Sequence, residues 1–116
     1  MAKLLINLTS GPEHPTRAAL GFLVARAAID QGHEVSLFLA GDAVQLMRDA
    51  VLDNLVGLGT GNLRESYDAL REGGATFYVS GMSSKVRGYE PDGSAEAAMP
   101  PKLVELVLDA DRVLTY

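Results

Sequence analysis

Three apolar runs of the chain each stop at a small, polar turn that contains a glycine. The runs are residues 3–8, 34–39 and 75–79. Segments with helical spacing lie between them, and strands that alternate with helices build a parallel sheet. Because a parallel sheet aligns the ends of its strands, the three turns are expected to meet at one edge, where open α/β sheets bind ligands.

This order of elements predicts one α/β domain over residues 1–116. The sheet is expected to be doubly wound and mainly parallel, with four to five strands and helices on both faces, as in flavodoxin-like folds. The predicted helices cover residues 15–31, 43–53, 63–72, 83–87 and 101–110, and a last short strand covers residues 113–115.

The first predicted helix has apolar residues at the spacing of a single buried stripe. Pro15 suits its first turn, and Gly32 is placed to end it. The stripe consists of Leu20, Leu23, Val24, Ala27 and Ala28. Four small residues would let this helix lie close to the sheet, namely Ala18, Ala19, Gly21 and Ala25.

Two side chains have the pattern of helix N-caps. Asp42 and Asn62 are each followed three residues later by Gln or Glu, as in a capping box.

Residues 55–61 carry three glycines, which predicts a loop. Residues 89–101 form the longest irregular stretch, which predicts a mobile loop over the site. The last helix is expected to bury Leu103, Val104, Leu106, Val107 and Ala110.

The charge balance argues against nucleic acid as a partner. The chain has 10 Lys and Arg against 15 Asp and Glu, a net charge of −5, and no basic stripe, whereas binding to a phosphate backbone needs clustered cations. The apolar stretches are too short to cross a membrane, and the amino terminus lacks the pattern of a signal peptide. We therefore expect a cytoplasmic protein.

The chain contains no cysteine. This excludes disulfides, thiolate metal sites and every mechanism that uses a cysteine nucleophile. It also disfavours a secreted protein, because small secreted domains usually depend on disulfides.

The expected edge of the sheet collects small, polar and basic side chains. The turn after the first strand lies between a strand end and a helix N-terminus, where backbone N–H groups favour an anion, although the glycine-rich fingerprints of nucleotide sites are absent. A tight turn with side-chain caps is the alternative. The predicted ligand-binding residues are Asn7, Ser10, Gly11, His14, Asp42, Ser80, Gly81, Met82, Ser83 and Arg87.

Ser80, Ser83 and His14 are the candidate catalytic residues, because a serine becomes a nucleophile only beside a base. His14 lies in the first turn, where Asp42 could orient it, whereas His33 is expected at the opposite end of the sheet. No spacing supports such a triad, and the nucleophile-elbow motif is absent. The acidic residues near His14 also lack the spacing of metal ligands, so we predict neither a metal nor a cofactor.

The last predicted strand has no following helix to cover it. A small sheet with an uncovered portion commonly binds a partner surface. We therefore predict a homo-oligomer.

Four segments of the chain resemble the DsrE/DsrF-like family, the group that includes the YchN-like proteins. They correspond to the first strand and turn, the second strand and turn, the third strand with its following loop, and the C-terminal end. The segments are residues 4–15 (LLINLTSGPEHP), 32–42 (GHEVSLFLAGD), 78–88 (YVSGMSSKVRG) and 107–116 (VLDADRVLTY).

The resemblance implies a doubly wound α/β domain that assembles into trimers or hexamers. Several family members act in sulfur relay and carry sulfur as a persulfide on a cysteine in the loop after the third strand. This chain has Ser80 and Ser83 in that loop, and a hydroxyl cannot hold a persulfide. The fold and the assembly are therefore expected to carry over, but the covalent sulfur step is not.

Three functions follow from these observations. The first is an oligomeric family member without catalysis, which binds a small molecule or an anion and works beside a sulfur-relay protein partner. The second is an enzyme that uses Ser80 or His14 in acid–base or nucleophilic chemistry. The third is a purely structural oligomer. The absence of cysteine favours the first and the third.

Overall fold

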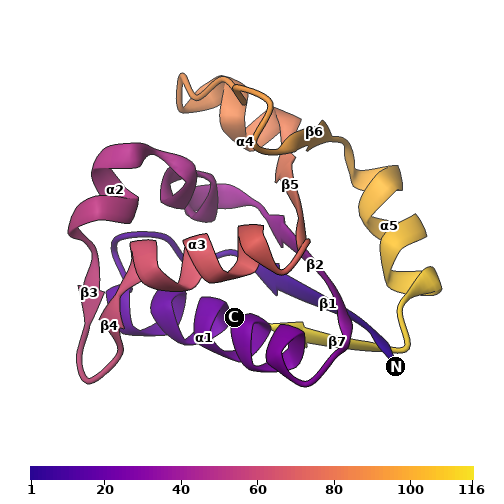
Figure 1. The fold of residues 1–116 in the computed structure, drawn as a ribbon. Helices are drawn as coiled ribbons and strands as arrows, with labels where there is room; N and C mark the ends of the chain where they lie inside the picture. Colours follow the sequence, from indigo (N-terminus) through magenta and orange to yellow (C-terminus); the bar gives the residue numbers. More distant parts are fainter.

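The computed structural model describes all of residues 1–116 (Figure 1). None of its helices combines the length and the apolar character that a bilayer-crossing helix requires. The elements along the chain are β1 (Lys3–Leu8), α1 (Pro15–Asp30), β2 (Glu34–Leu39), the 3-10 helix η1 (Gly41–Met47), α2 (Asp49–Asn54), β3 (Val56–Gly57), β4 (Gly61–Asn62), α3 (Leu63–Glu72), β5 (Thr76–Ser80), α4 (Gly81–Val86), β6 (Glu96–Ala98), α5 (Pro100–Asp109) and β7 (Arg112–Thr115).

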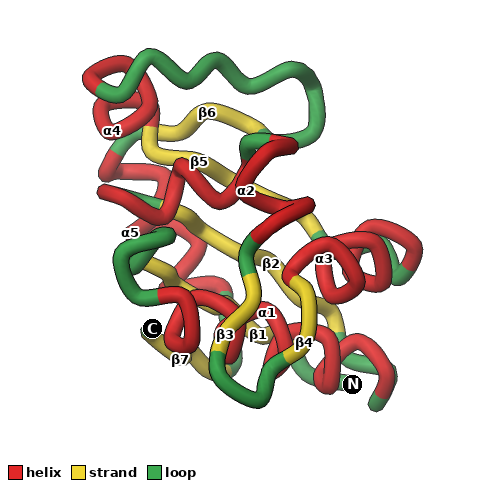
Figure 2. Tube along the Cα trace, turned by 90° about the vertical axis from the view of Figure 1, so that its left-hand side faces the viewer, coloured by secondary structure: helices red, strands yellow, loops and turns green.

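Five of the strands form one sheet in the order β6-β5-β2-β1-β7 (Figure 2). Every neighbouring pair in this sheet is parallel, which confirms the predicted α/β class and its mainly parallel sheet. β1 and β2 have the predicted bounds. The remaining two strands, β3 and β4, form a separate antiparallel pair.

Helices cover both faces of the sheet, as predicted: α1 and α3 lie on one side and α5 on the other (Figure 1). The larger core lies under α1 and α3, where Phe22 and Tyr67 both contact Phe77 of β5, with ring centroids 6.2 and 5.3 Å away. A smaller core of three residues lies on the opposite face of the sheet, under α5. It consists of Leu5, Phe38 and Ala98, packed against Leu103, Leu106 and Ala110.

α1 packs on the sheet through four small residues and Phe22, and not through the predicted stripe. Its buried residues are Ala18, Ala19, Gly21, Phe22 and Ala25. Within the predicted stripe, Leu20 is 42% exposed, Ala27 is also exposed, and the other three residues are half-buried. The physical reason is close approach: a Cβ on Gly21 would lie 2.7 Å from Leu8 Cδ2. The face with the smallest side chains therefore fits best against the strands.

The prediction of one continuous helix over residues 43–53 is wrong. The structure has η1, a break at Arg48 and then α2. Asp42 caps neither helix, since η1 is preceded by Ala40 and has no side-chain cap. The break follows from a tertiary contact: Arg48 has an extended backbone, and its guanidinium donates a hydrogen bond to the carbonyl oxygen of Arg87 at 2.8 Å. The predicted cap at Asn62 is confirmed, because its side chain accepts a hydrogen bond from the first turn of α3.

Two segments that were predicted as loops contain strands. The glycine-rich segment 55–61 contains β3 and the start of β4, which form a short hairpin. The segment 89–101 contains β6, which pairs with β5 and forms one edge of the sheet. β6 has the sequence Glu-Ala-Ala, which lacks the β-branched and aromatic residues that mark a strand. Its conformation therefore depends on the hydrogen bonds that β5 offers.

α5 is not buried in the way the sequence predicts, because no residue of this helix is fully buried. Leu103 and Leu106 face the sheet, whereas three other apolar side chains point away from the core. We call these three residues the α5 surface: Val104 (57% exposed), Val107 (40%) and Leu108 (81%). A single helix lies on this side of the sheet and contacts it along one stripe, so the rest of its apolar surface has no neighbour in the monomer.

Candidate functional site

The turns at the carboxyl edge of the sheet are joined by hydrogen bonds. The backbone N–H of Thr9, after β1, donates to the carbonyl oxygen of Tyr116, after β7, at 2.9 Å. The backbone N–H of Gly41, after β2, donates to Ser83 Oγ of α4 at 2.8 Å. These bonds join the segments after β1 and β7 to each other, and likewise the segments after β2 and β5.

Gly11 brings the first and second turns into backbone contact. A Cβ on Gly11 would lie only 2.1 Å from the carbonyl oxygen of Asp42. Ser10, next to Gly11, is buried. The backbone N–H of Gly11 donates to both carboxylate oxygens of Glu13. The first turn is thus closed by its own acidic side chain, which binds the N–H group that an external anion would use.

Asp42 forms an ion pair with Arg87 instead of capping a helix. Its Oδ1 accepts a hydrogen bond from Nε of Arg87 at 3.0 Å and lies 3.0 Å from Nη2 of the same guanidinium. The guanidinium also donates to the carbonyl oxygen of Ser83 at 3.2 Å. These bonds join η1 to the end of α4, so two of the predicted ligand-binding residues, Asp42 and Arg87, are partners of each other.

The two candidate serines both use their hydroxyl oxygens to bind backbone N–H groups. Ser80 is the N-cap of α4, and its Oγ accepts from the N–H of Ser83 at 3.1 Å. Ser83 Oγ in turn accepts from the N–H of Gly41. No hydrogen bond joins His14 to either serine. The oxygens therefore organise the loop, and nothing in the structure activates them as nucleophiles.

The two histidines lie at opposite ends of the sheet, as predicted. His33 Nδ1 accepts a hydrogen bond from the N–H of Ala2 at 3.0 Å, beside the start of β1. His14 precedes α1 at the carboxyl edge. No three His, Asp or Glu side chains come close enough together to hold a metal ion.

Two buried polar atoms have no hydrogen-bond partner in the protein, namely Asn7 Oδ1 and Ser84 Oγ. Native proteins leave few buried polar atoms unpaired, so each such atom needs an explanation. Asn7 is a predicted ligand-binding residue near the end of β1, and its amide oxygen is a free acceptor.

Gly81 and Met82 are also predicted ligand-binding residues, and they form the start of α4. Met82 is exposed, and Gly81 lies beside Met99.

Arg48 was not predicted as part of this edge. Its guanidinium lies 5.5 Å from the ring centroid of Tyr89 and donates to the carbonyl oxygen of Arg87. Burial is the largest effect on the Tyr89 phenol, and it raises the pKa of this group. The phenol is therefore neutral at physiological pH. No sequence motif marks Arg48 as part of this edge, because Arg87 and Tyr89 lie about 40 residues away along the chain.

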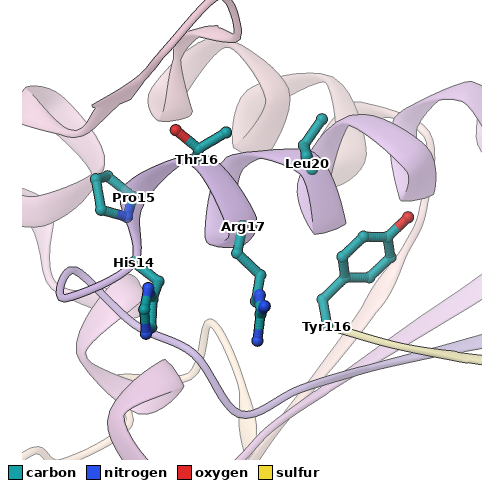
Figure 3. A pocket seen from close by; sticks show the side chains of 6 residues that line it. All are labelled: His14, Pro15, Thr16, Arg17, Leu20 and Tyr116. Atoms are coloured by element: carbon teal, nitrogen blue, oxygen red, sulfur yellow. The ribbon is translucent and has the colours of Figure 1, made fainter.

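A shallow pocket of about 440 Å³ lies beside the start of α1, on the flank of the joined turns (Figure 3). It contains His14, the one predicted site residue among its lining residues, and the unpredicted Arg17 and Tyr116. Tyr116 directly follows β7, so this pocket forms only when the last strand pairs with β1. Its remaining lining residues are Pro15, Thr16 and Leu20.

Comparison with solved structures finds similar folds. YchN from E. coli superposes with a TM-score of 0.81 at 24% identity, over 100% of both chains. A conserved protein of unknown function from Bacteroides thetaiotaomicron, BT1422, has a TM-score of 0.69 at 14% identity, over 99% of this chain and 95% of its own. A search of curated protein sequences gives no match. The sequence profile of the DsrE/DsrF-like family matches residues 2–116, and the chain therefore belongs to this family.

Proposed function

We propose that the protein is an oligomeric DsrE/DsrF-like domain that binds a small ligand at its carboxyl edge and does not itself carry persulfide sulfur. The observation that carries this proposal is the pair Ser80 and Ser83, in a chain without cysteine. Both hydroxyl oxygens accept hydrogen bonds from backbone N–H groups of the turns. On this proposal residues 1–116 act as one cytoplasmic domain beside a thiol-bearing sulfur-relay partner.

The chemistry of the hydroxyl group supports the proposal that the protein does not carry persulfide sulfur. A cysteine persulfide forms when a thiolate attacks the outer sulfur of a persulfide donor and displaces the donor's thiolate. A serine hydroxyl is not ionised near neutral pH without a base beside it. His14, the only histidine at this edge, makes no hydrogen bond to a serine. An enzyme that uses Ser80 or His14 therefore has less support than a binding or structural role.

The α5 surface supports self-assembly. Val104, Val107 and Leu108 are exposed on a helix that has no other neighbour on its outer side. β7 lies at the adjacent edge of the sheet and is exposed over its whole length. An exposed apolar helix next to an open strand edge is a typical protein–protein contact region. We assign it to contacts between copies of this chain.

Native mass spectrometry of the purified protein tests the proposal. We expect the mass of a trimer or a hexamer, together with a small retained molecule that is released when the protein unfolds. An oligomer without any retained molecule would favour the purely structural role. A monomer at micromolar concentration would contradict the proposed assembly.

Replacing Ser80 with cysteine is expected to create a reactive thiol. The thiolate would accept the Ser83 N–H hydrogen bond that Ser80 Oγ accepts now, and hydrogen bonding to the charged form lowers a thiol pKa. We expect Ser80→Cys to react with iodoacetamide at neutral pH several-fold faster than a free model thiol. It is also expected to accept sulfur from a persulfide donor, which mass spectrometry detects.

Ser94→Cys is the matched control for this experiment. Ser94 is half-buried like Ser80 but lies in the loop before β6, beside the carboxylate of Asp92. A nearby negative charge raises a thiol pKa, so this variant should react no faster than the model thiol. Equal rates for the two variants would mean that the loop after β5 does not activate a thiol.

A further inference from the structure

The pocket beside the start of α1 (Figure 3) differs in charge from the protein as a whole. The chain has a net charge of −5, yet the pocket is lined by two basic residues, His14 and Arg17, and by no acidic one. The neighbouring Glu13 folds back onto the N–H of Gly11. The first turn of α1 also contains no acidic residue and no side-chain cap. The pocket is therefore a local region that favours negative charge.

Arg17 has no partner within the protein. The chain has seven arginines, and five of them donate hydrogen bonds from their guanidinium groups. The exceptions are Arg17 and Arg26, which both lie on α1. An arginine that lines a pocket without an internal partner keeps its planar set of donors free for a carboxylate or a phosphate. Figure 3 shows the side chains of His14 and Arg17 pointing to the same side of α1.

Two other lining residues give the pocket apolar surface. Leu20 is 42% exposed on the same helix, one turn after Arg17. The ring of Tyr116 lies across from the Arg17 side chain (Figure 3). A volume of about 440 Å³ is in the range of small-molecule sites. The pocket therefore combines the free guanidinium of Arg17 and the imidazole of His14 with an apolar surface, at the size of a small organic molecule.

We propose that this pocket binds a small organic oxyanion, a phosphate monoester or a carboxylate that carries an apolar group. Arg17 and His14 hold the oxyanion, and Leu20 and the ring of Tyr116 contact the apolar group. This inference rests on the proposed function, because it names the chemical class and the location of the small ligand.

Titration of the full chain with phenyl phosphate, followed by ¹H–¹⁵N NMR, tests the proposal. We expect saturable shifts of the backbone amides of residue 14, residues 16–20 and residue 116. Arg17→Gln should weaken binding by about tenfold, because it removes a hydrogen-bond donor to a charged group. Arg17 is exposed, so this variant is expected to fold normally. Benzyl alcohol, which keeps the ring but lacks the anion, should cause no saturable shift.

Arg26→Gln is the matched control, since Arg26 is on the same helix and also lacks a partner but does not line the pocket. Its affinity for phenyl phosphate should stay within about twofold of wild type. Equal weakening by both variants, or shifts centred elsewhere, would overturn the proposal. If phenyl phosphate does not bind but native mass spectrometry finds a retained molecule, the oxyanion assignment fails and the proposed function stands. If phenyl phosphate does not bind and no retained molecule is found, both the oxyanion assignment and the proposed function fail.

Discussion

Replacing Gly11 with alanine is expected to destabilise the protein by about 3 kcal/mol and to move the first two turns of the candidate site apart. A Cβ at this position would lie 2.1 Å from the carbonyl oxygen and 2.6 Å from the carbonyl carbon of Asp42. Both are backbone atoms, which cannot relieve the overlap by changing a rotamer. Urea denaturation measures the loss of stability, and the amide signals of Gly41 and Asp42 report the displacement.

Gly81→Ala is the control for this change, because Gly81 lies at the same edge. Its Cβ would meet the sulfur of Met99 at 3.4 Å, an ordinary contact with the flexible end of a side chain. Gly81 is the first residue of α4, and alanine is the better helix former, so the stability should change by less than about 1 kcal/mol. Wild-type stability in Gly11→Ala would show that the two turns are not in close contact.

The sequence predicted the central part of the sheet well, because several independent signals agree there. β1 and β2 are nearly continuous apolar runs, and each is followed by a glycine-containing turn. Gly32 has a φ of 87°, which non-glycine residues rarely adopt, so a helix end before β2 could be placed from the sequence. Asn62 caps α3 through a bond to a residue two positions later. Such signals are local, and a single sequence contains them.

The elements that the sequence did not predict depend on distant partners. β6 forms because β5 offers it a hydrogen-bonding edge. The buried face of α1 could not be predicted from spacing, because apolar or small residues surround most of this helix. The choice between faces depends on the close approach of Gly21 to Leu8, which is a property of the packed structure.

The candidate site was predicted in part. The alignment of strand ends placed the turns at one edge, and the contacts of Gly11 with Asp42 and of Gly41 with Ser83 are found there. The sequence did not show that these polar groups would bind one another. Nor did it show that the open space would lie beside Arg17 and Tyr116, because these two residues are distant in sequence and become neighbours only through the pairing of β7 with β1.

Replacing both Val104 and Val107 with glutamate is expected to convert the proposed oligomer to monomers. The two residues are one helical turn apart on the α5 surface and do not belong to the stripe that packs on the sheet. Both are exposed in the monomer, so the glutamates should cost the fold only about 0.5 kcal/mol. In an interface between copies they would bury unpaired charges, which is strongly unfavourable. Sedimentation velocity at micromolar concentration measures the change.

Leu58→Glu is the control for assembly, since Leu58 is 91% exposed in the β3–β4 hairpin, on the opposite side of the molecule from α5 (Figure 1). This variant should sediment as wild type. Because each substitution adds a charged side chain at an exposed apolar position, a loss of assembly in both variants would point to a general effect of charge. An unchanged oligomer in the double variant would place the interface elsewhere, and the exposure of α5 would then need another explanation.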